Sequence, residues 1–298
     1  MLENRMALHR LQYSHPRQRM YQIGVPQLCY ALDTGCTMRL QAFIFNWPGK
    51  KQHAAMLERM FAPHCEVIVI NSDDSLRSCY PHWQHIGNDG YFTDQWNAAL
   101  QRFDADVLVH IQGDIWPSEV GRVLSECMRF IKDHGVGVYA PNTNFNPHVY
   151  RTQSLRKLEE GVYEVPATDC SFWAVPAEVI RNTPRVDPHV NRLGWGIEYL
   201  VGAVARRCGR KIVRDYRFTA GHLRSRGYDS EQAAQEWEQL KKVVDPSLTK
   251  EMESLQHERN TLVSHTTSWG HPVARLLTAV GSRTSRGAIL LQRRITSH

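Results

Sequence analysis

The chain has 298 residues, of which 42% are hydrophobic, so it is long enough to bury one large core. No stretch reaches the roughly 20 uncharged apolar residues that a membrane-spanning helix needs. The seven cysteines form no CxxC pair, which argues against a zinc site or a disulfide framework. We expect a cytoplasmic protein, because the N-terminal stretch lacks the apolar core of a secretory signal.

The formal net charge of +6 is concentrated at the two ends of the sequence. Residues 259–298 hold six arginines and no acidic residue, and residues 1–39 hold five arginines against two acids. The stretch between them is therefore net acidic, which excludes a broad basic nucleic-acid surface on the body of the protein.

The first expected elements alternate between buried strands and helices. An apolar strand at 40–46 precedes a helix at 53–61 and a strand at 66–70, and a helix at 92–102 leads into a strand at 107–112. This order predicts a parallel sheet with right-handed crossovers. Polar residues follow the strands at one edge of the sheet, where α/β proteins bind their ligands.

The second half is less regular. A polar and aromatic segment at 141–166 predicts a hairpin or a loop that faces an acceptor. The other expected elements are a helix at 118–133, a strand at 136–140, a strand at 170–175, a helix at 176–181, a loop at 184–191, a helix from 194 to 207, a strand at 211–218 and a helix from 229 or 230 to 244.

The strand ends carry polar residues in a fixed order. Asn46 ends the first strand, a cluster at 71–75 ends the second, and Gln112-Gly113-Asp114 ends the third, with His222 after a later strand. This order resembles the nucleotide-sugar glycosyltransferases of the GT-A fold, most closely inverting family 2, over about residues 38–228. The resemblance implies a Rossmann-like α/β fold with a mixed, mostly parallel sheet flanked by helices.

The resemblance also implies a metal site. In that family an Asp-x-Asp motif holds a divalent cation against the donor diphosphate, and Asp114 matches its second acid. His222 matches a histidine that completes the metal site in many relatives, so both are expected ligands of Mg²⁺ or Mn²⁺. Gln112 departs from the motif, because an amide replaces the first acid, and it is expected at the donor ribose. A helix-capping role remains the alternative for Asp114.

A second motif concerns the chemistry at the acceptor. The segment from Gly194 to Tyr199 resembles the Gly-Trp-Gly-x-Glu-Asp segment of several sugar transferases, although Tyr199 replaces the second acid. The resemblance implies that Glu198 is the catalytic base and that Trp195 contacts the acceptor. A glutamate that only stabilises the helix dipole is the alternative. Asp169, also expected near the acceptor, and Asp187 are the substitutes for the base.

For the donor, the resemblance implies a UDP-sugar. Asn46, Asn71 and Asp73 would contact the uracil or the ribose, and Arg224 and Arg226 would contact phosphate. Three other histidines lack such placement and are expected to be structural, namely His110, His148 and His189.

These expectations divide the chain into an N-terminal extension at 1–39, a catalytic domain at 40–228 and a helical, basic C-terminal extension at 229–298. In the extension, an apolar stripe at 273–280 together with the arginines predicts an interfacial helix at an anionic membrane. A solvated tail is the alternative.

The expected function is metal-dependent, inverting sugar transfer to a glycan or lipid-linked acceptor in bacterial surface-glycan synthesis, in the cytoplasm or at the inner membrane face. Two other interpretations stay open. One is transfer to hydroxylated nucleobases in DNA, with the basic ends along phosphate. The other is a non-catalytic module that binds nucleotide sugars, since Gln112 and Tyr199 depart from the family pattern.

Overall fold

The computed structural model describes residues 38–144, 147–222 and 229–263, and a ten-stranded sheet runs through them. Arg224, Arg226, most of the expected N-terminal extension and the stripe at 273–280 lie outside the described residues. The strands are β1 (Leu40–Asn46), β2 (Glu66–Asn71), β3 (Gln84–His85), β4 (Val107–Gln112), β5 (Ile115–Trp116), β6 (Val136–Thr143), β7 (Arg156–Glu159), β8 (Val162–Glu164), β9 (Phe172–Pro176) and β10 (Lys211–His222).

The sheet has the order β3-β2-β1-β4-β9-β6-β10-β8-β7, and β5 pairs with the end of β10. The strands β3, β2, β1 and β4 are parallel, as are β6 and β10. β9 runs antiparallel to both of its neighbours, β4 and β6. The expected α/β fold with a mixed sheet and mostly parallel central strands is therefore confirmed.

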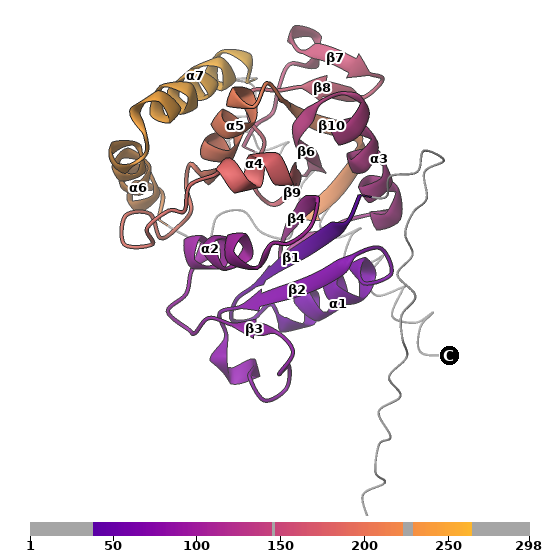
Figure 1. Ribbon diagram of the computed structural model, residues 1–298, viewed down its shortest axis with the longest axis vertical. Coiled ribbons are helices and arrows are strands. Elements are labelled where there is room, and N and C mark those ends of the chain that lie inside the picture. The colour runs from indigo at the N-terminus through magenta and orange to yellow at the C-terminus, as the bar shows by residue number, and fades with distance from the viewer. Residues whose placement is uncertain (1–37, 145–146, 223–228, 264–298) are drawn as a thin grey trace, which may run out of the picture.

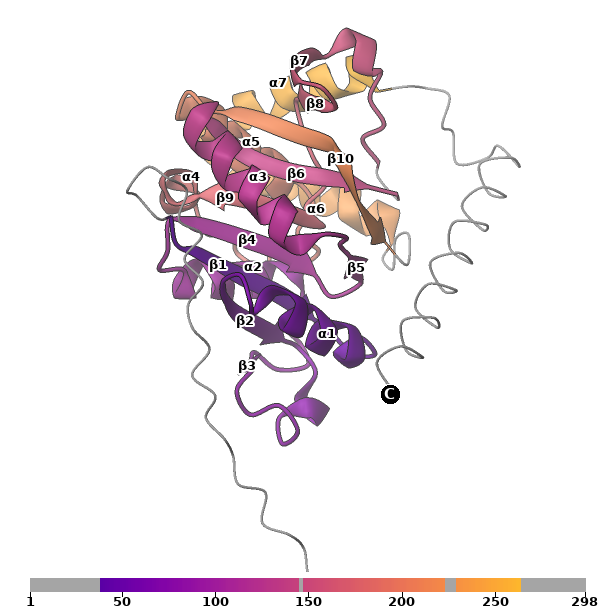
Figure 2. The same cartoon turned by 90° about the vertical axis from the view of Figure 1, so that its right-hand side faces the viewer.

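Helices cover both faces of the sheet. α1 and α3 lie on one face, and the remaining helices lie on the opposite face (Figures 1 and 2). The helices are α1 (Lys51–Phe61), α2 (Phe92–Arg102), α3 (Val120–Asp133), α4 (Ala177–Asn182), α5 (Ile197–Arg207), α6 (Ser230–Val243) and α7 (Pro246–Leu262).

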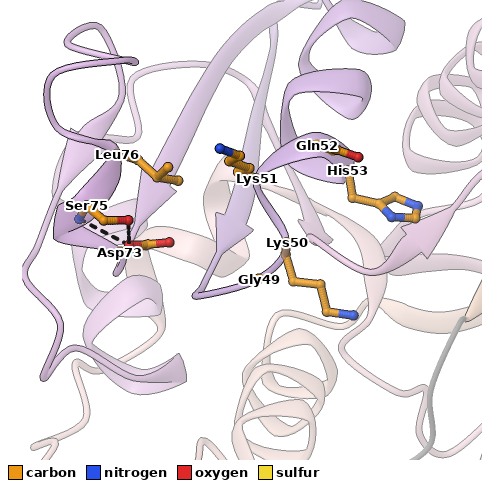
Figure 3. A pocket seen from close by; sticks show the side chains of 8 residues that line it. All are labelled: Gly49, Lys50, Lys51, Gln52, His53, Asp73, Ser75 and Leu76. Carbon is orange, nitrogen blue, oxygen red and sulfur yellow. Dashed lines mark hydrogen bonds between the residues drawn. The ribbon is translucent and has the colours of Figure 1, made fainter.

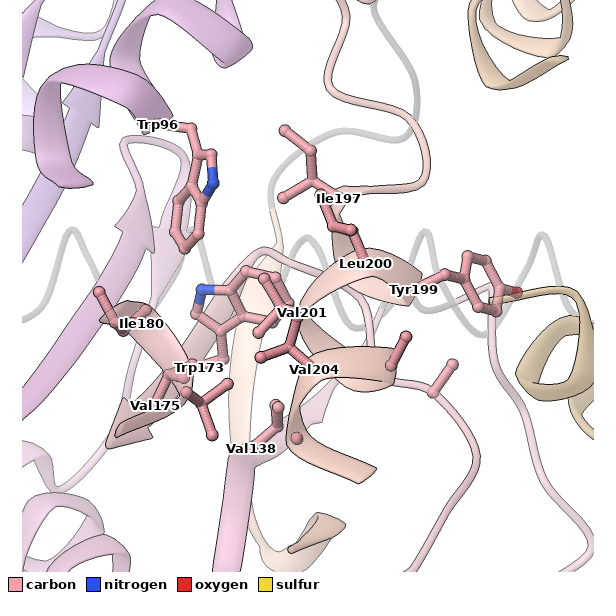
Figure 4. Packing of buried hydrophobic residues seen from close by; sticks show 14 of the residues in the cluster. Trp96, Val138, Trp173, Val175, Ile180, Ile197, Tyr199, Leu200, Val201 and Val204 are labelled. Carbon is pink, nitrogen blue, oxygen red and sulfur yellow. The ribbon is translucent and has the colours of Figure 1, made fainter. Parts of the chain in front are cut away.

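The strand β1 shows why its sequence is apolar throughout. Phe43 and Phe45 pack into the cluster that contains α2 and α5, whereas Ala42 and Ile44 pack into the cluster that contains α1 and α3. A central strand that is buried on both faces has no polar alternation. Figure 4 shows the first cluster, in which Trp173 of β9 packs against α5.

Helices α6 and α7 pack on α5, although both belong to the expected C-terminal extension. Trp237 of α6 and Met252 and Leu255 of α7 are buried in the same cluster as α5. We did not expect α7 from the sequence, because its apolar residues are sparse among charged ones. A start signal is nevertheless present, since Asp245 accepts the backbone N–H of Ser247 at 3.0 Å and Pro246 follows it.

The strand β10 is longer than predicted and reaches past the edge of β6. Its register against β6 shifts between Asp215 and Thr219, and its end then pairs antiparallel with β5. This extension carries His222 to the end of β4. Within the ranges that the structure covers, no helix has both the length and the apolar character needed to cross a membrane.

Candidate functional site

The end of β4 holds Asp114 beside His222. Gly113 forms the turn after β4, where its N–H donates to the carbonyl of Phe45 at 2.8 Å, and an added Cβ would lie 2.6 Å from that oxygen. β5 then pairs with β10, with Ile115 opposite His222. The His222 Nε2 atom is 3.4 Å from the Asp114 Oδ2 atom. Two residues far apart in the sequence thus share one site.

Asp114 and His222 fit a divalent cation. The Asp114 side chain is 8% exposed, and its Oδ1 atom has no hydrogen-bond partner within the described ranges. A buried carboxylate oxygen without a donor is a place where a cation can bind, and imidazole nitrogen is an accepted ligand of Mn²⁺. The same ranges hold no group of three His, Cys, Asp or Glu residues that could bind a metal. The donor phosphates and water would therefore complete the ligand set.

A pocket of about 390 Å³ lies at the carboxyl ends of β1 and β2. Asp73 and Ser75 lie on one side of it, and Lys50 and His53 lie on the other (Figure 3). Asp73 accepts the backbone N–H of Ser75 at 3.1 Å and begins the short 3₁₀ helix Asp74–Leu76. Asp73 therefore lines the pocket, and its expected contact with a nucleoside stays a prediction.

Asn46 and Asn71 are fully buried below this pocket and do not line it. The Asn46 Nδ2 atom donates to Asn71 Oδ1 at 2.6 Å, and Asn71 Nδ2 donates to the Asp73 carbonyl at 2.7 Å. The Gln95 amide also donates to the Asn46 carbonyl at 2.8 Å. The two asparagines hold the strand ends together, and their expected contact with the uracil or the ribose stays a prediction.

The Gly-Trp-Gly segment has a conformation that requires both glycines. Gly194 and Gly196 have φ values of 78° and 91°, in the left-handed region. An added Cβ would lie 2.1 Å from Phe92 at Gly194 and 2.1 Å from Trp237 at Gly196. The tight turn starts α5 directly after Gly196 and places Glu198 in the first turn of the helix.

Glu198 is partly buried and has a perturbed acidity. Its Oε2 atom accepts the Gly196 backbone N–H at 3.0 Å. Burial, with a smaller contribution from the charge of Asp169, raises the pKa of Glu198 to about 7 against the opposing effect of the backbone hydrogen bonds. A carboxyl group with a pKa near neutrality is suited to accept a proton in the physiological range.

Asp169 lies in the same neighbourhood but is held by several partners. It accepts hydrogen bonds from the Thr143 hydroxyl at 2.9 Å and the Ser171 backbone N–H at 3.1 Å. Arg214, which is only 1% exposed, lies 3.8 Å from the Asp169 carboxylate. These contacts fix the position of the Asp169 carboxylate.

Gln112 lies at the end of β4, beside Cys170. Its Nε2 atom is 4.0 Å from the thiol sulfur of Cys170, so the amide is directed at Cys170. Burial raises the pKa of the Cys170 thiol well above its ordinary value, and the charge of Glu198 adds to the effect. The expected ribose contact of Gln112 stays a prediction, and the structure shows its amide next to the Cys170 thiol.

The remaining expected residues are less closely joined to the site. Trp195 is half-buried, and its carbonyl accepts the Asn191 side-chain amide at 2.6 Å. Asp187 accepts the His189 backbone N–H at 2.9 Å and lines a separate pocket of about 200 Å³ against the turn between α6 and α7. Asp187 is therefore not brought to the site that contains Glu198.

Sequence reasoning missed Lys50, which is the nearest basic side chain to Asp114 after His222. The Lys50 Nζ atom is 3.9 Å from Asp114 Oδ2, and the side chain is 18% exposed. The signal was a lysine directly after the Trp47-Pro48-Gly49 turn that ends β1. A basic residue at that edge of a parallel sheet is well placed for an anionic ligand.

The sheet is mixed with mostly parallel central strands, and the candidate site lies at the ends of those strands. No family model and no curated protein matches the chain.

Solved structures match at low identity. One is GalNAc-T7 with UDP, GalNAc and Mn²⁺, at 11% identity and a TM-score of 0.49, covering 81% of this chain and 58% of that one. Another is glucosyl-3-phosphoglycerate synthase from Mycobacterium tuberculosis with Mg²⁺ and UDP, at 12% identity and a TM-score of 0.47, covering 72% of this chain and 80% of that one. A third is CMP:2-keto-3-deoxy-manno-octonic acid synthetase with CTP, at 16% identity and a TM-score of 0.38, covering 67% and 96%.

Proposed function

We propose that the protein is an inverting glycosyltransferase that moves a sugar from a nucleoside-diphosphate donor, a UDP-sugar, to an acceptor hydroxyl. One observation carries the proposal. Asp114 and His222 meet at the end of β4, next to Lys50, which lines the pocket at β1 and β2. A cation-binding pair and a carboxyl group of near-neutral pKa are the two groups that displacement of a nucleoside diphosphate needs.

The proposed reaction uses the residues of the site as follows. Glu198 accepts the proton of the acceptor hydroxyl, and the oxygen bonds to the anomeric carbon from the face opposite the leaving group. The bond from that carbon to the diphosphate oxygen breaks, which inverts the configuration. Mg²⁺ or Mn²⁺ held by Asp114 and His222 would neutralise the departing diphosphate.

Other residues would bind the two substrates. Asp73 lines the pocket in which we place the nucleoside. Arg224 and Arg226, outside the described residues, stay proposed phosphate contacts. Trp195 and Asp169 would contact the acceptor, which we propose is a glycan or a lipid-linked sugar of a bacterial surface polymer.

The test is a donor-hydrolysis and transfer assay with a panel of UDP-, GDP- and dTDP-sugars, with and without chelator. We expect turnover with one donor, loss of metal-dependent turnover in Asp114→Asn, and weaker turnover in His222→Ala. Asp104→Asn is the matched control, because the Asp104 side chain is 90% exposed. Turnover that is unchanged by chelator and by both substitutions contradicts the metal role. Absence of turnover and of nucleotide binding across the panel contradicts the whole proposal.

A basic C-terminal segment suggests where the protein works. We propose that the five arginines of residues 264–298 hold it at an anionic membrane near a lipid-linked acceptor. Co-sedimentation of the full chain and of 1–263 with anionic vesicles tests this, beside a titration with duplex DNA. Tight DNA binding through the segment, without vesicle binding, would overturn the membrane contact and favour a nucleic-acid acceptor.

A further inference from the structure

Lys50 has an unusual position for a lysine. It follows the turn that ends β1 and stands directly before α1, with its side chain mostly buried. Its ammonium group is 3.9 Å from the Asp114 carboxylate and 5.9 Å from the centre of the Trp47 ring. Lysine is rarely buried without a partner. The neighbouring Lys51 is exposed and lines the same pocket, so the two lysines differ in their contact with Asp114.

The contact leaves the ammonium group of Lys50 able to bind more oxygens. At 3.9 Å the contact with Asp114 is an ion pair beyond hydrogen-bond distance, and an ammonium group carries three N–H donors. Lys50 also lines the pocket at β1 and β2 on the side opposite Asp73, and Figure 3 shows its ammonium group directed away from Asp73. An oxyanion in that pocket would therefore meet a preformed cation.

The charge of this site differs from that of an Asp-x-Asp site. Two carboxylates would give −2, whereas here Gln112 is neutral and Lys50 balances Asp114. A site with less negative charge attracts a divalent cation less strongly and repels a diphosphate less. The first turn of α1, where Lys51 and Gln52 line the pocket, adds the positive end of a helix dipole.

We propose that Lys50 binds the donor diphosphate directly, so that nucleoside diphosphates bind this protein in the absence of a divalent cation. The inference rests on the proposed function, because it assigns the ligand of the same site. Lys50 would then supply part of the charge neutralisation that the family leaves to the metal. An ammonium group is a common phosphate ligand because it offers a compact positive charge.

Isothermal titration of the full chain with UDP, GDP and dTDP tests the inference, once with EDTA and once with Mn²⁺. The variants are Lys50→Gln, Lys50→Arg and the matched control Lys51→Gln, each checked by its melting temperature. Lys50→Met, which keeps the aliphatic stem against Trp47, is measured as a second neutral variant. We expect metal-free binding that weakens roughly tenfold or more in both neutral Lys50 variants. It should change less than about threefold in Lys51→Gln and stay close to wild type in Lys50→Arg.

The outcomes separate the inference from the function on which it rests. Equal weakening in Lys50→Gln and Lys51→Gln would reflect general charge only and would overturn the inference, as would unchanged binding in the Lys50 variants. Nucleotide binding by the wild type only with Mn²⁺ would also overturn it and would leave the proposed glycosyltransferase intact. No binding of any of the three nucleotides under either condition would overturn both.

Discussion

Glu198 offers the sharpest test of the chemistry, because its acidity sets a pH profile. With a pKa of about 7, roughly a tenth of the side chain is ionised at pH 6 and roughly nine tenths at pH 8. If the ionised form removes the acceptor proton, kcat/KM should rise about ninefold between these pH values. A glutamate of ordinary pKa, about 4.3, would be fully ionised throughout and would give a flat profile.

Glu198→Gln should lower transfer by about 10²-fold or more and abolish the pH dependence, while nucleotide binding stays unchanged. Glu160→Gln is the control, because it makes the same replacement at a side chain that is 88% exposed. A flat wild-type profile, or near-normal turnover in Glu198→Gln, would refute the role. The role of the base would then pass to Asp169, which lies near Glu198.

Glu198→Gln should also change the stability of the protein, which can be measured without a substrate. The folded pKa of Glu198 lies above its ordinary value of 4.5, so ionisation favours the unfolded chain as the pH rises through that window. Above pH 7, ionisation of Glu198 lowers the free energy of unfolding by about 3 kcal/mol, which follows from the difference between the two pKa values. Glu198→Gln should therefore raise the melting temperature at pH 8 and change it little at pH 4.5. A decrease at pH 8 would mean that burial does not perturb this group.

Two further predictions concern the scaffold. Gly196→Ala should destabilise the fold by several kcal/mol, because the new Cβ would meet Trp237 at 2.1 Å in a left-handed turn. Gly209→Ala is the control, since Gly209 is also left-handed but has nothing within 4 Å of an added Cβ. It should lower the free energy of unfolding by about 1 kcal/mol. Urea melts measure both, and equal losses would contradict the steric argument. His110 is fully buried, and burial lowers its pKa to about 3, so stability should fall as the pH drops below 6.5, by about 2 kcal/mol at pH 5. His110→Leu should remove that part of the acid sensitivity, and urea melts at pH 7 and pH 5 that show the same pH dependence in both proteins would contradict it.

The sequence allowed the order of strands and helices to be predicted where apolar runs are long. β1 and β4 are buried on both faces, and such runs leave few alternatives. α7 was missed because only Leu248, Met252 and Leu255 of this helix are buried, so its apolar stripe is narrow and its pattern is weak. Packing against a neighbour decided this element, and a single sequence does not record that neighbour.

The site was predictable in its general location and less so in its details. An amide at a strand end can bind a ligand or join the next strand, and both uses have the same sequence pattern. Asn46 and Asn71 join β1 to β2 through a 2.6 Å hydrogen bond. The order of residues in the sequence does not show this contact. Lys50 could have been noticed from its place after β1, but its contact with Asp114 depends on how two loops approach each other.

The replacement of the second acid by Tyr199 has a structural cause in α6. Tyr199 is buried with its ring 5.4 Å from that of Trp237, and Figure 4 shows it directed away from Trp173. Trp237 also packs directly on Gly196, and the neighbouring Glu236 accepts the Leu193 backbone N–H at 2.6 Å. α6 thus holds both ends of the turn that positions Glu198. Because the position after Glu198 packs against the Trp237 ring, an aromatic side chain buries more apolar surface there than a carboxylate would.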